Sequence, residues 1–180
     1  MTNFKYKKIE NFLSVDELNL LTSYCKIKHS TNFTNFEENG PNSNCDSSFY
    51  GDPVMESLML NKLNLMEKET NLKLLPTYSY WRCYTKFADL PAHKDRPSCE
   101  YSVTVMIDSD KTEWPIIVND NFFLLKRGEA LIYKGCEFIH KRDEFKGDYH
   151  MQAFLHYVDK IGPNKEWHMD KRKMFGMNKQ

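Results

Sequence analysis

The second half of this chain consists of short runs of β-branched and aromatic residues with turn-forming residues between them. Beyond Pro76 the runs fall near residues 77–86, 99–107, 114–118, 121–125, 129–133, 136–140 and 149–158. Turn pairs such as Asn119-Asp120 and Lys134-Gly135 separate them, as expected between strands. Many short strands at close spacing are typical of a β-barrel or a β-sandwich. An all-β core is therefore predicted for this part of the chain.

The N-terminal part of the chain predicts two helices. Ser14 and Glu17 have the spacing of a capping box, and the apolar stripe that follows predicts an amphipathic helix over residues 15–27. Asp52 precedes a proline, which is a typical helix start, and an apolar face then predicts a helix over residues 53–70. Two helices followed by a β core predict an α+β fold in which the helices pack on the sheet.

The length of 180 residues suits one structural domain. We expect an N-terminal helical layer and surface loop over residues 1–73, the β core over 74–160 and a C-terminal tail over 161–180. Within the first segment, residues 29–51 are rich in Asn, Ser, Gly and Glu, which predicts a long surface loop. Loops of that length are often functional, so this loop is a candidate substrate lid.

Charge and cysteine content argue against several classes of protein. The 25 Lys and Arg residues balance 25 Asp and Glu residues, so no overall field favours a nucleic acid or a membrane surface. Five cysteines are scattered without a C-x-x-C pair, which indicates reduced thiols of an intracellular protein. No stretch approaches the roughly 18 apolar residues of a membrane span, and the N-terminus has no apolar leader. We expect a soluble, cytoplasmic monomer with no membrane partner.

His93 and Asp95 are the residues with the clearest chemical potential. Side chains two apart on an extended strand point to the same face, so an imidazole and a carboxylate would converge there. With His140 from a distant strand they would form a two-histidine, one-carboxylate set, which binds ferrous iron and leaves coordination positions open. Two plainer interpretations remain. The first pair could lie in a solvated turn, and His140 could be a strand-end histidine bonded to a backbone carbonyl.

Ordered sequence blocks around these residues resemble the iron(II)/2-oxoglutarate oxygenases, in particular their prolyl-4-hydroxylase-like branch. The run Arg82-Cys-Tyr84…His93-Lys-Asp95 is similar to the R-x-Y…H-x-D segment of that branch, with the same nine-residue step from tyrosine to histidine. The chain is more similar still to short oxygenases of phage and marine bacterial genomes. It shares with them the blocks Asp95-Arg-Pro-Ser-Cys-Glu100, Trp114-Pro115, Gly128-Glu-Ala-Leu-Ile-Tyr133, Gly135-Cys-Glu…His140 and Gln152-Ala-Phe-Leu-His-Tyr-Val158.

This resemblance covers about residues 74–160 and implies a double-stranded β-helix, a jelly-roll or cupin-like fold that holds iron at its open end. It implies Fe(II) bound by His93, Asp95 and His140, with 2-oxoglutarate as cosubstrate and O2 as oxidant. The implied enzyme is a hydroxylase that couples decarboxylation of 2-oxoglutarate, to succinate and CO2, with oxidation of a substrate. The substrate could be a protein side chain, a small molecule or a nucleotide. The implied location is the cytoplasm of a bacterial or phage-infected cell.

The far carboxylate of 2-oxoglutarate needs a buried counter-charge, and here the chain departs from the family pattern. The branch that it resembles has an Arg or Lys about ten residues past the second histidine, where this chain has His150. His150 could carry the charge if it is protonated. Arg142 shares the face of His140 if the strand continues, and arginine binds carboxylates through two parallel hydrogen bonds. Arg142 is equally compatible with a solvated cation in the charged run 141–144.

Two more residues are candidates for cosubstrate binding. Tyr84 could donate a hydrogen bond to 2-oxoglutarate, although a buried core tyrosine would fit the same pattern. Gln152 shares a strand face with His150 and could line the same pocket. Because position 150 is not basic, two other functions stay open: a non-catalytic metal-binding module, and a cupin-like metal enzyme that does not use 2-oxoglutarate. Arg96 follows the metal carboxylate and could either steer substrate or tie down its own loop.

Overall fold

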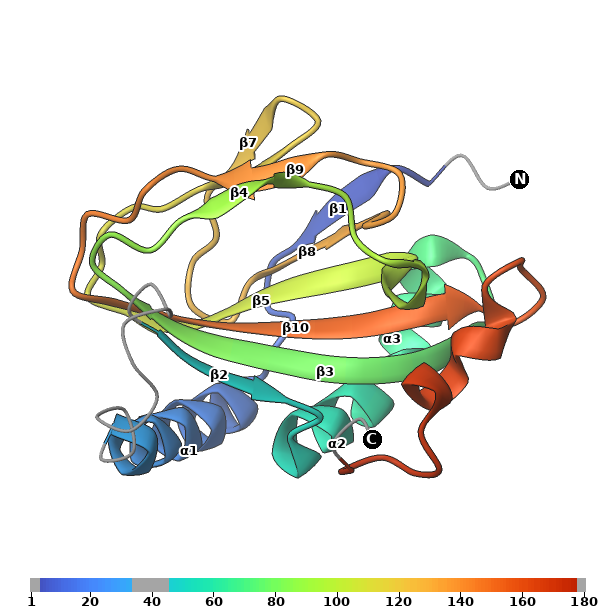
Figure 1. The fold of residues 1–180 in the computed structure, drawn as a ribbon, viewed down its shortest axis with the longest axis horizontal. Coiled ribbons are helices and arrows are strands. Elements are labelled where there is room, and N and C mark those ends of the chain that lie inside the picture. The colour runs from blue at the N-terminus through green and yellow to red at the C-terminus, as the bar shows by residue number, and fades with distance from the viewer. Residues whose placement is uncertain (1–3, 34–45, 178–180) are drawn as a thin grey trace.

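Two antiparallel sheets face each other, and the helices cover the outer face of the larger one (Figure 1). The computed structural model describes residues 4–33 and 46–177. The six-stranded sheet has the order β1 (Tyr6–Ile9), β8 (Ala130–Tyr133), β5 (Tyr101–Ser109), β10 (Tyr149–Asp159), β3 (Leu74–Thr85) and β2 (Asp46–Tyr50). The four-stranded sheet has the order β4 (Leu90–His93), β9 (His140–Arg142), β6 (Ile116–Val118) and β7 (Asn121–Phe123). This arrangement confirms the predicted α+β class with a β core.

Local capping signals place the helix starts where the sequence predicts them. The helices are α1 (Val15–Phe33), α2 (Pro53–Asn61) and α3 (Leu63–Thr70). The Ser14 N–H donates to the Glu17 carboxylate at 2.8 Å, and the Glu17 N–H donates to the Ser14 hydroxyl at 3.2 Å, which completes the capping box. The Asp52 carboxylate accepts from the N–H groups of Val54 and Met55 at the start of α2. In the described part of the chain, no helix is long and apolar enough to cross a bilayer.

The first helix extends beyond its predicted end, because tertiary contacts continue after the apolar stripe stops. Helix α1 runs to Phe33 and not to residue 27. Near its end, Lys28 forms an ion pair with the buried Asp52 and also bonds the Tyr24 hydroxyl. The loop predicted over 29–51 is therefore wrong at both ends, since it begins in α1 and finishes in β2. Its middle, residues 34–45, lies outside the described residues, so the candidate lid stays a prediction.

Three strands were not predicted, and each is hard to recognise from local pattern. β1 has two consecutive lysines between Tyr6 and Ile9 and pairs with β8 at the edge of the large sheet. β2 begins with polar residues and pairs with β3, where Phe49 stacks on Trp81 with ring centroids 4.3 Å apart. β4 is short and contains Pro91. The N-terminal segment thus supplies strands as well as helices, which corrects the expectation of a purely helical layer and loop over 1–73.

The remaining differences concern element boundaries. The predicted helix over 53–70 is divided at Lys62 into α2 and α3, and α3 ends at Asn71, which has a left-handed backbone with φ of 56°. The strand predicted over 136–140 begins four residues later, because β9 spans His140–Arg142 and shares only His140 with the predicted range. That shift matters for function, because it puts His140 at the start of a strand whose next inward residue is Arg142.

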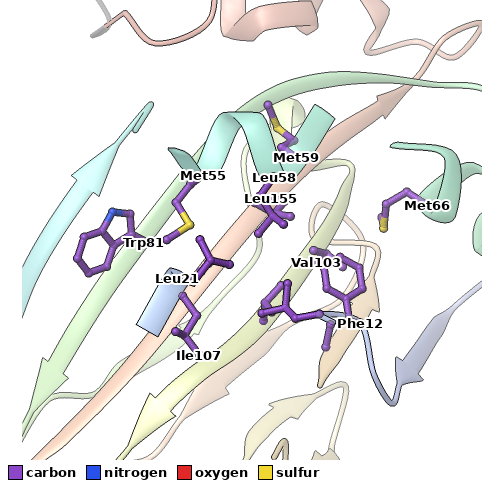
Figure 2. Packing of buried hydrophobic residues seen from close by; sticks show 14 of the residues in the cluster. Phe12, Leu21, Met55, Leu58, Met59, Met66, Trp81, Val103, Ile107 and Leu155 are labelled. Atoms are coloured by element: carbon purple, nitrogen blue, oxygen red, sulfur yellow. The ribbon is translucent and has the colours of Figure 1, made fainter. Parts of the chain in front are cut away.

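The main hydrophobic core lies between the helices and the large sheet (Figure 2). Met55 and Met59 of α2 reach towards Trp81 of β3 and Leu155 of β10, and all four side chains are fully buried. Burial of such a side chain contributes about 1.5–3 kcal/mol. This packing confirms that the N-terminal helices lie on the sheet. It also leaves the opposite face of β3, β5 and β10 to meet the small sheet.

Candidate active site

The pairing of two short strands brings His93 and His140 together. β4 and β9 are antiparallel, and His93 lies directly opposite His140 in their register. Their ring centroids are 4.3 Å apart. Asp95 follows β4 and directs its Oδ1 to within 3.7 Å of the His93 Nε2 and 3.5 Å of the His140 Nε2. The three ligand atoms lie within 4.8 Å of one another, a spacing that suits one metal ion with bonds of about 2.1 Å.

Both histidines present the same nitrogen to this point. The His93 Nδ1 lies 2.7 Å from the Pro91 carbonyl oxygen, and the His140 Nδ1 lies 3.1 Å from the Phe138 carbonyl oxygen. A carbonyl can only accept, so each Nδ1 carries its proton and each Nε2 is free to bind a metal. His140 therefore does bond a backbone carbonyl, as the plainer interpretation of this residue expects. The same bond turns the Nε2 of the ring towards the metal position.

Asp95 is held from the side away from the histidines. Its N–H donates to the Gly135 carbonyl at 2.9 Å, and its Oδ2 accepts from the Ser102 hydroxyl at 3.0 Å. A Cβ atom at position 135 would overlap the Asp95 carboxylate, so a glycine is required there. Burial opposes ionisation of Asp95, but hydrogen bonds with His140 and His93 hold its pKa well below the usual range. The hydrogen bond with the same carboxylate raises the pKa of His93, as expected for an imidazole beside a negative charge.

A cavity of about 190 Å³ opens beside the three residues, between the two sheets. Its walls are mostly aromatic. Besides His93, Asp95 and His140, it is lined by Tyr78, Tyr80, Arg82, Tyr84, Leu90, Tyr133, Phe154 and His156. Such walls exclude water from a reacting centre and still leave room for a small ligand.

Comparison with known proteins identifies the architecture. No protein-family model and no curated protein matches this sequence, but many solved structures do. A 2-oxoglutarate complex of the collagen prolyl hydroxylase of Paramecium bursaria Chlorella virus-1 matches 86% of this chain and 96% of its own, at 12% identity and TM-score 0.65. An oxidoreductase of the 2OG-Fe(II) oxygenase family from Burkholderia pseudomallei matches 89% and 87%, at 12% identity and TM-score 0.63.

A third match carries both a metal and the cosubstrate. HygX of Streptomyces hygroscopicus, with nickel and 2-oxoglutarate bound, matches 87% of this chain and 83% of its own, at 10% identity and TM-score 0.65. The fold is a double-stranded β-helix. At these identities the likeness establishes the fold, and the activity has to be argued from this chain's own residues.

Inside the double-stranded β-helix, Arg142 is a buried cation without a carboxylate partner among the described residues. It follows His140 on the inner face of β9 and is 2% exposed. Its Nη1 donates to the Trp114 carbonyl, and its guanidinium lies 4.6 Å from the centre of the Trp114 ring. No described residue forms a hydrogen bond with its Nε or Nη2. Burial lowers the pKa of Arg142 to about 10, so it is still charged at neutral pH. The alternative of a solvated cation is wrong.

His150 occupies a different environment in the β-helix. It is 4% exposed, and its Nε2 lies 2.8 Å from the Gln152 Oε1. The Gln152 amide in turn donates to the Thr104 hydroxyl at 2.6 Å. Burial and then the charge of Arg142 lower the pKa of His150 to about 3. His150 is therefore neutral at physiological pH, and of the two substitutes that the sequence offers, only Arg142 carries a charge.

Tyr84 lies near both the metal residues and Arg142. It lines the cavity beside His93, and its ring meets that of Trp114 edge-on with centroids 4.9 Å apart. The hydroxyls of Tyr84 and Tyr133 raise the pKa of Arg142 against the effect of burial, which places both close to the guanidinium. Tyr84 and Tyr133, which line the cavity, thus separate it from Arg142, which does not line it.

Several residues around the site were not predicted from the sequence. His156 lies in the cavity wall, and its Nδ1 is 2.9 Å from the Ser102 hydroxyl that bonds Asp95. The period-two alternation of β10 is the one local signal for it, since His156 shares a face with Gln152. Arg96 donates two bonds of 2.7 Å to the buried Asp170 of the C-terminal tail. Arg96 therefore ties down its loop. No local sequence pattern predicts Asp170 as its partner.

Proposed function

We propose that this protein is an Fe(II)/2-oxoglutarate-dependent oxygenase, most simply a hydroxylase. One observation carries the proposal: the buried, unpaired Arg142 lies two residues beyond His140 on the strand that completes a two-histidine, one-carboxylate set. Two residues of a strand span about 6.7 Å, which a five-carbon dicarboxylate can bridge between a metal and a guanidinium. A buried arginine with two free N–H groups is the natural partner of such a carboxylate.

The residues of the chain would divide the work as follows. His93, Asp95 and His140 would hold the iron through two Nε2 atoms and one carboxylate oxygen. Bound iron with 2-oxoglutarate and O2 would supply the oxidising chemistry, with succinate and CO2 as coproducts. Arg142 would bind the far carboxylate through its Nε and Nη2, and Tyr84 would bind beside it. The aromatic walls of the cavity would exclude water from the reacting centre.

The buried guanidinium of Arg142 also bears on the competing functions. The absence of a basic residue at position 150 favours a non-catalytic metal module or a cupin-like enzyme without 2-oxoglutarate. Arg142 would supply the missing charge from β9 in the small sheet, so a non-basic position 150 is also compatible with an oxygenase. His150 and Gln152 would support the pocket by hydrogen bonding and not by charge.

We further infer a single catalytic domain that acts as a monomer in the cytoplasm. Four of the cysteines are free thiols, and three of these, Cys25, Cys83 and Cys99, are buried, as is usual in a reducing compartment. The substrate class stays open between a protein side chain, a small molecule and a nucleotide. Tyr80, Arg82 and Phe154 are the half-buried cavity residues that would meet it.

Spectroscopy of the metal centre tests the proposal. Anaerobic addition of Fe(II) and 2-oxoglutarate should produce a visible charge-transfer band, and His93→Ala should abolish it. Lys94→Ala is the matched control, since Lys94 is exposed beside His93 and should keep the band. Iron binding by the unmodified chain without any band on addition of 2-oxoglutarate would contradict the proposal and favour the module or the cupin-like enzyme. Succinate release under O2 should accompany the band.

A further inference from the structure

A second and larger cavity, of about 480 Å³, lies at the end of the β-helix where β5 finishes and β10 begins. Figure 1 shows these two strand ends close together near α1. Its walls come from the end of β5, the loop before β6, the loop before β8, the start of β10 and one residue of α1. It shares no lining residue with the cavity beside the metal ligands. Its volume is within the range of small-molecule sites.

The inner wall of this cavity is apolar but holds one buried nitrogen without a partner. Met106 and Trp114 line it and are each 5% exposed, and Leu125 is 7% exposed. His150 lines the same wall, and its Nδ1 has no hydrogen-bond partner in the part of the chain that the structure describes. Because its Nε2 is already engaged by Gln152, only Nδ1 remains for a visiting group. Buried ring nitrogens are normally bonded, so this one indicates a missing ligand atom or a missing water.

The rim of the cavity carries an excess of positive charge. Four cations, Lys26, Lys111, Lys126 and Arg127, and two carboxylates, Asp108 and Glu113, line it. Asp108 is already paired, with the Lys26 Nζ at 2.7 Å and the Arg127 Nε at 3.0 Å. Within residues 4–33 and 46–177, Lys111 and Lys126 form no ion pair. The two lysines are thus available for an anion, which would also bring the local charge closer to balance.

We propose that this cavity is a second small-molecule site, which binds an organic anion with a flat apolar body, such as an aromatic carboxylate. The apolar body would lie against Met106 and Trp114, where it would replace water on buried apolar surface. The anionic group would lie at the rim with Lys111 and Lys126. The free Nδ1 of His150 can only accept, because the Nε2–H donates to the Gln152 Oε1. It would accept from a hydroxyl or N–H group of the ligand, or from a water held beside it. Charge at the rim and an apolar interior together select for this class, because inorganic anions lack the body and neutral aromatics lack the charge.

Benzoate is the probe for the test, with benzyl alcohol as a neutral compound of similar size. The full chain is titrated with each compound and followed by two-dimensional 1H–15N NMR, first alone and then with Zn²⁺ and saturating 2-oxoglutarate. We expect saturable shifts at the Trp114 indole N–H and the His150 amide, with benzyl alcohol at least about fivefold weaker. Addition of Zn²⁺ and 2-oxoglutarate should not displace benzoate.

Charge reversal at the rim separates this site from non-specific binding. The double variant Lys111→Glu/Lys126→Glu should weaken benzoate at least about tenfold without loss of fold. The matched control, Lys165→Glu/Lys173→Glu, makes the same change at exposed tail positions and should bind as the unmodified chain does. Three results would overturn the proposal: shifts centred on His93 and His140, equal binding of benzyl alcohol, or unchanged affinity in the Lys111→Glu/Lys126→Glu variant.

Discussion

The two faces of β10 show how one buried strand can serve two purposes. Its outer residues Met151, Ala153, Leu155 and Tyr157 belong to the core beneath the helices. Its inner residues His150, Gln152, Phe154 and His156 face the small sheet and are in or beside the two cavities. The outer set is chosen for packing. The inner set mixes imidazoles, an amide and an aromatic ring.

The two faces differ in which buried polar atoms lack a hydrogen-bond partner. On the outer face, the one hydroxyl of the set is satisfied, as the Tyr157 hydroxyl donates to the Met59 carbonyl at 2.7 Å. On the inner side, the Nε and Nη2 of Arg142 and the Nδ1 of His150 lack hydrogen-bond partners among the described residues. Unpaired buried polar groups cost stability. The outer core contains one as well, the Trp81 Nε1, but on the inner side the unbonded atoms belong to a cation and to a ring that lines a cavity, which indicates that the space between the sheets is built for ligands.

A cavity in the outer core should damage folding and leave the chemistry intact. Leu155→Ala should lower the free energy of unfolding by about 2–5 kcal/mol, because a fully buried leucine leaves a space that cannot fill. Urea denaturation measures the change, and the Fe(II)/2-oxoglutarate band should persist in the folded fraction. Leu155→Met, with similar volume, should cost less than about 1.5 kcal/mol. If Leu155→Ala lost the band but unfolded at the same urea concentration as the unmodified chain, the outer face would serve the chemistry and not the packing.

Removal of the Arg142 guanidinium should weaken cosubstrate binding without loss of stability. Arg142→Met should weaken 2-oxoglutarate binding by about 30–100-fold, or roughly 2–3 kcal/mol, because the far carboxylate loses its charged partner. Its free energy of unfolding should stay level or rise, since the variant no longer buries an unpaired charge. Isothermal titration and urea denaturation give the two quantities, and Lys141→Ala is the neighbouring control. If Arg142→Met were less stable but bound 2-oxoglutarate normally, Arg142 would stabilise the fold and would not bind the cosubstrate.

The inner histidines should make stability fall in acid. Burial lowers the pKa of His150 to about 3 and that of His156 to about 4, against about 6.5 when unfolded. Between these values the unfolded chain binds the extra protons, so stability declines as the pH drops below 6.5. At pH 5 each histidine should cost about 2 kcal/mol. His150→Gln should remove its share of the loss between pH 7 and 5; an unchanged slope would show that His150 is not buried as a neutral ring.

The smallest effect is expected far from both cavities. Ser14→Ala removes the hydroxyl that caps α1 and should lower the free energy of unfolding by about 0.5–2 kcal/mol. Thermal unfolding measures it, while metal and 2-oxoglutarate binding should match those of the unmodified chain. Ser14→Asp, which keeps a capping oxygen, should restore most of the loss. Altered metal binding in Ser14→Ala would mean that the outer layer controls the site.

Much of the site follows from local pattern, and the part that does not is instructive. The H-x-D spacing predicts that His93 and Asp95 converge, and they do, with His140 as third member. Local pattern favoured Arg142 only slightly over His150 for the buried charge, and it left Arg142 equally compatible with a solvated cation, because a charge run looks the same whether it is solvated or folded inward. It also missed β1 and β2, whose polar residues become strands only through pairing with β8 and β3.

By itself, the sequence determines what depends on neighbours along the chain: the caps at Ser14 and Asp52, the strand periods, and the shared face of His93 and Asp95. These are set by backbone geometry over a few residues, so they can be read locally. Only the tertiary structure decides which strands pair. It places His93 opposite His140, buries Arg142 over Trp114 and lowers the pKa of His150. Burial and register are properties of the whole packed chain, because each depends on segments that are distant in sequence.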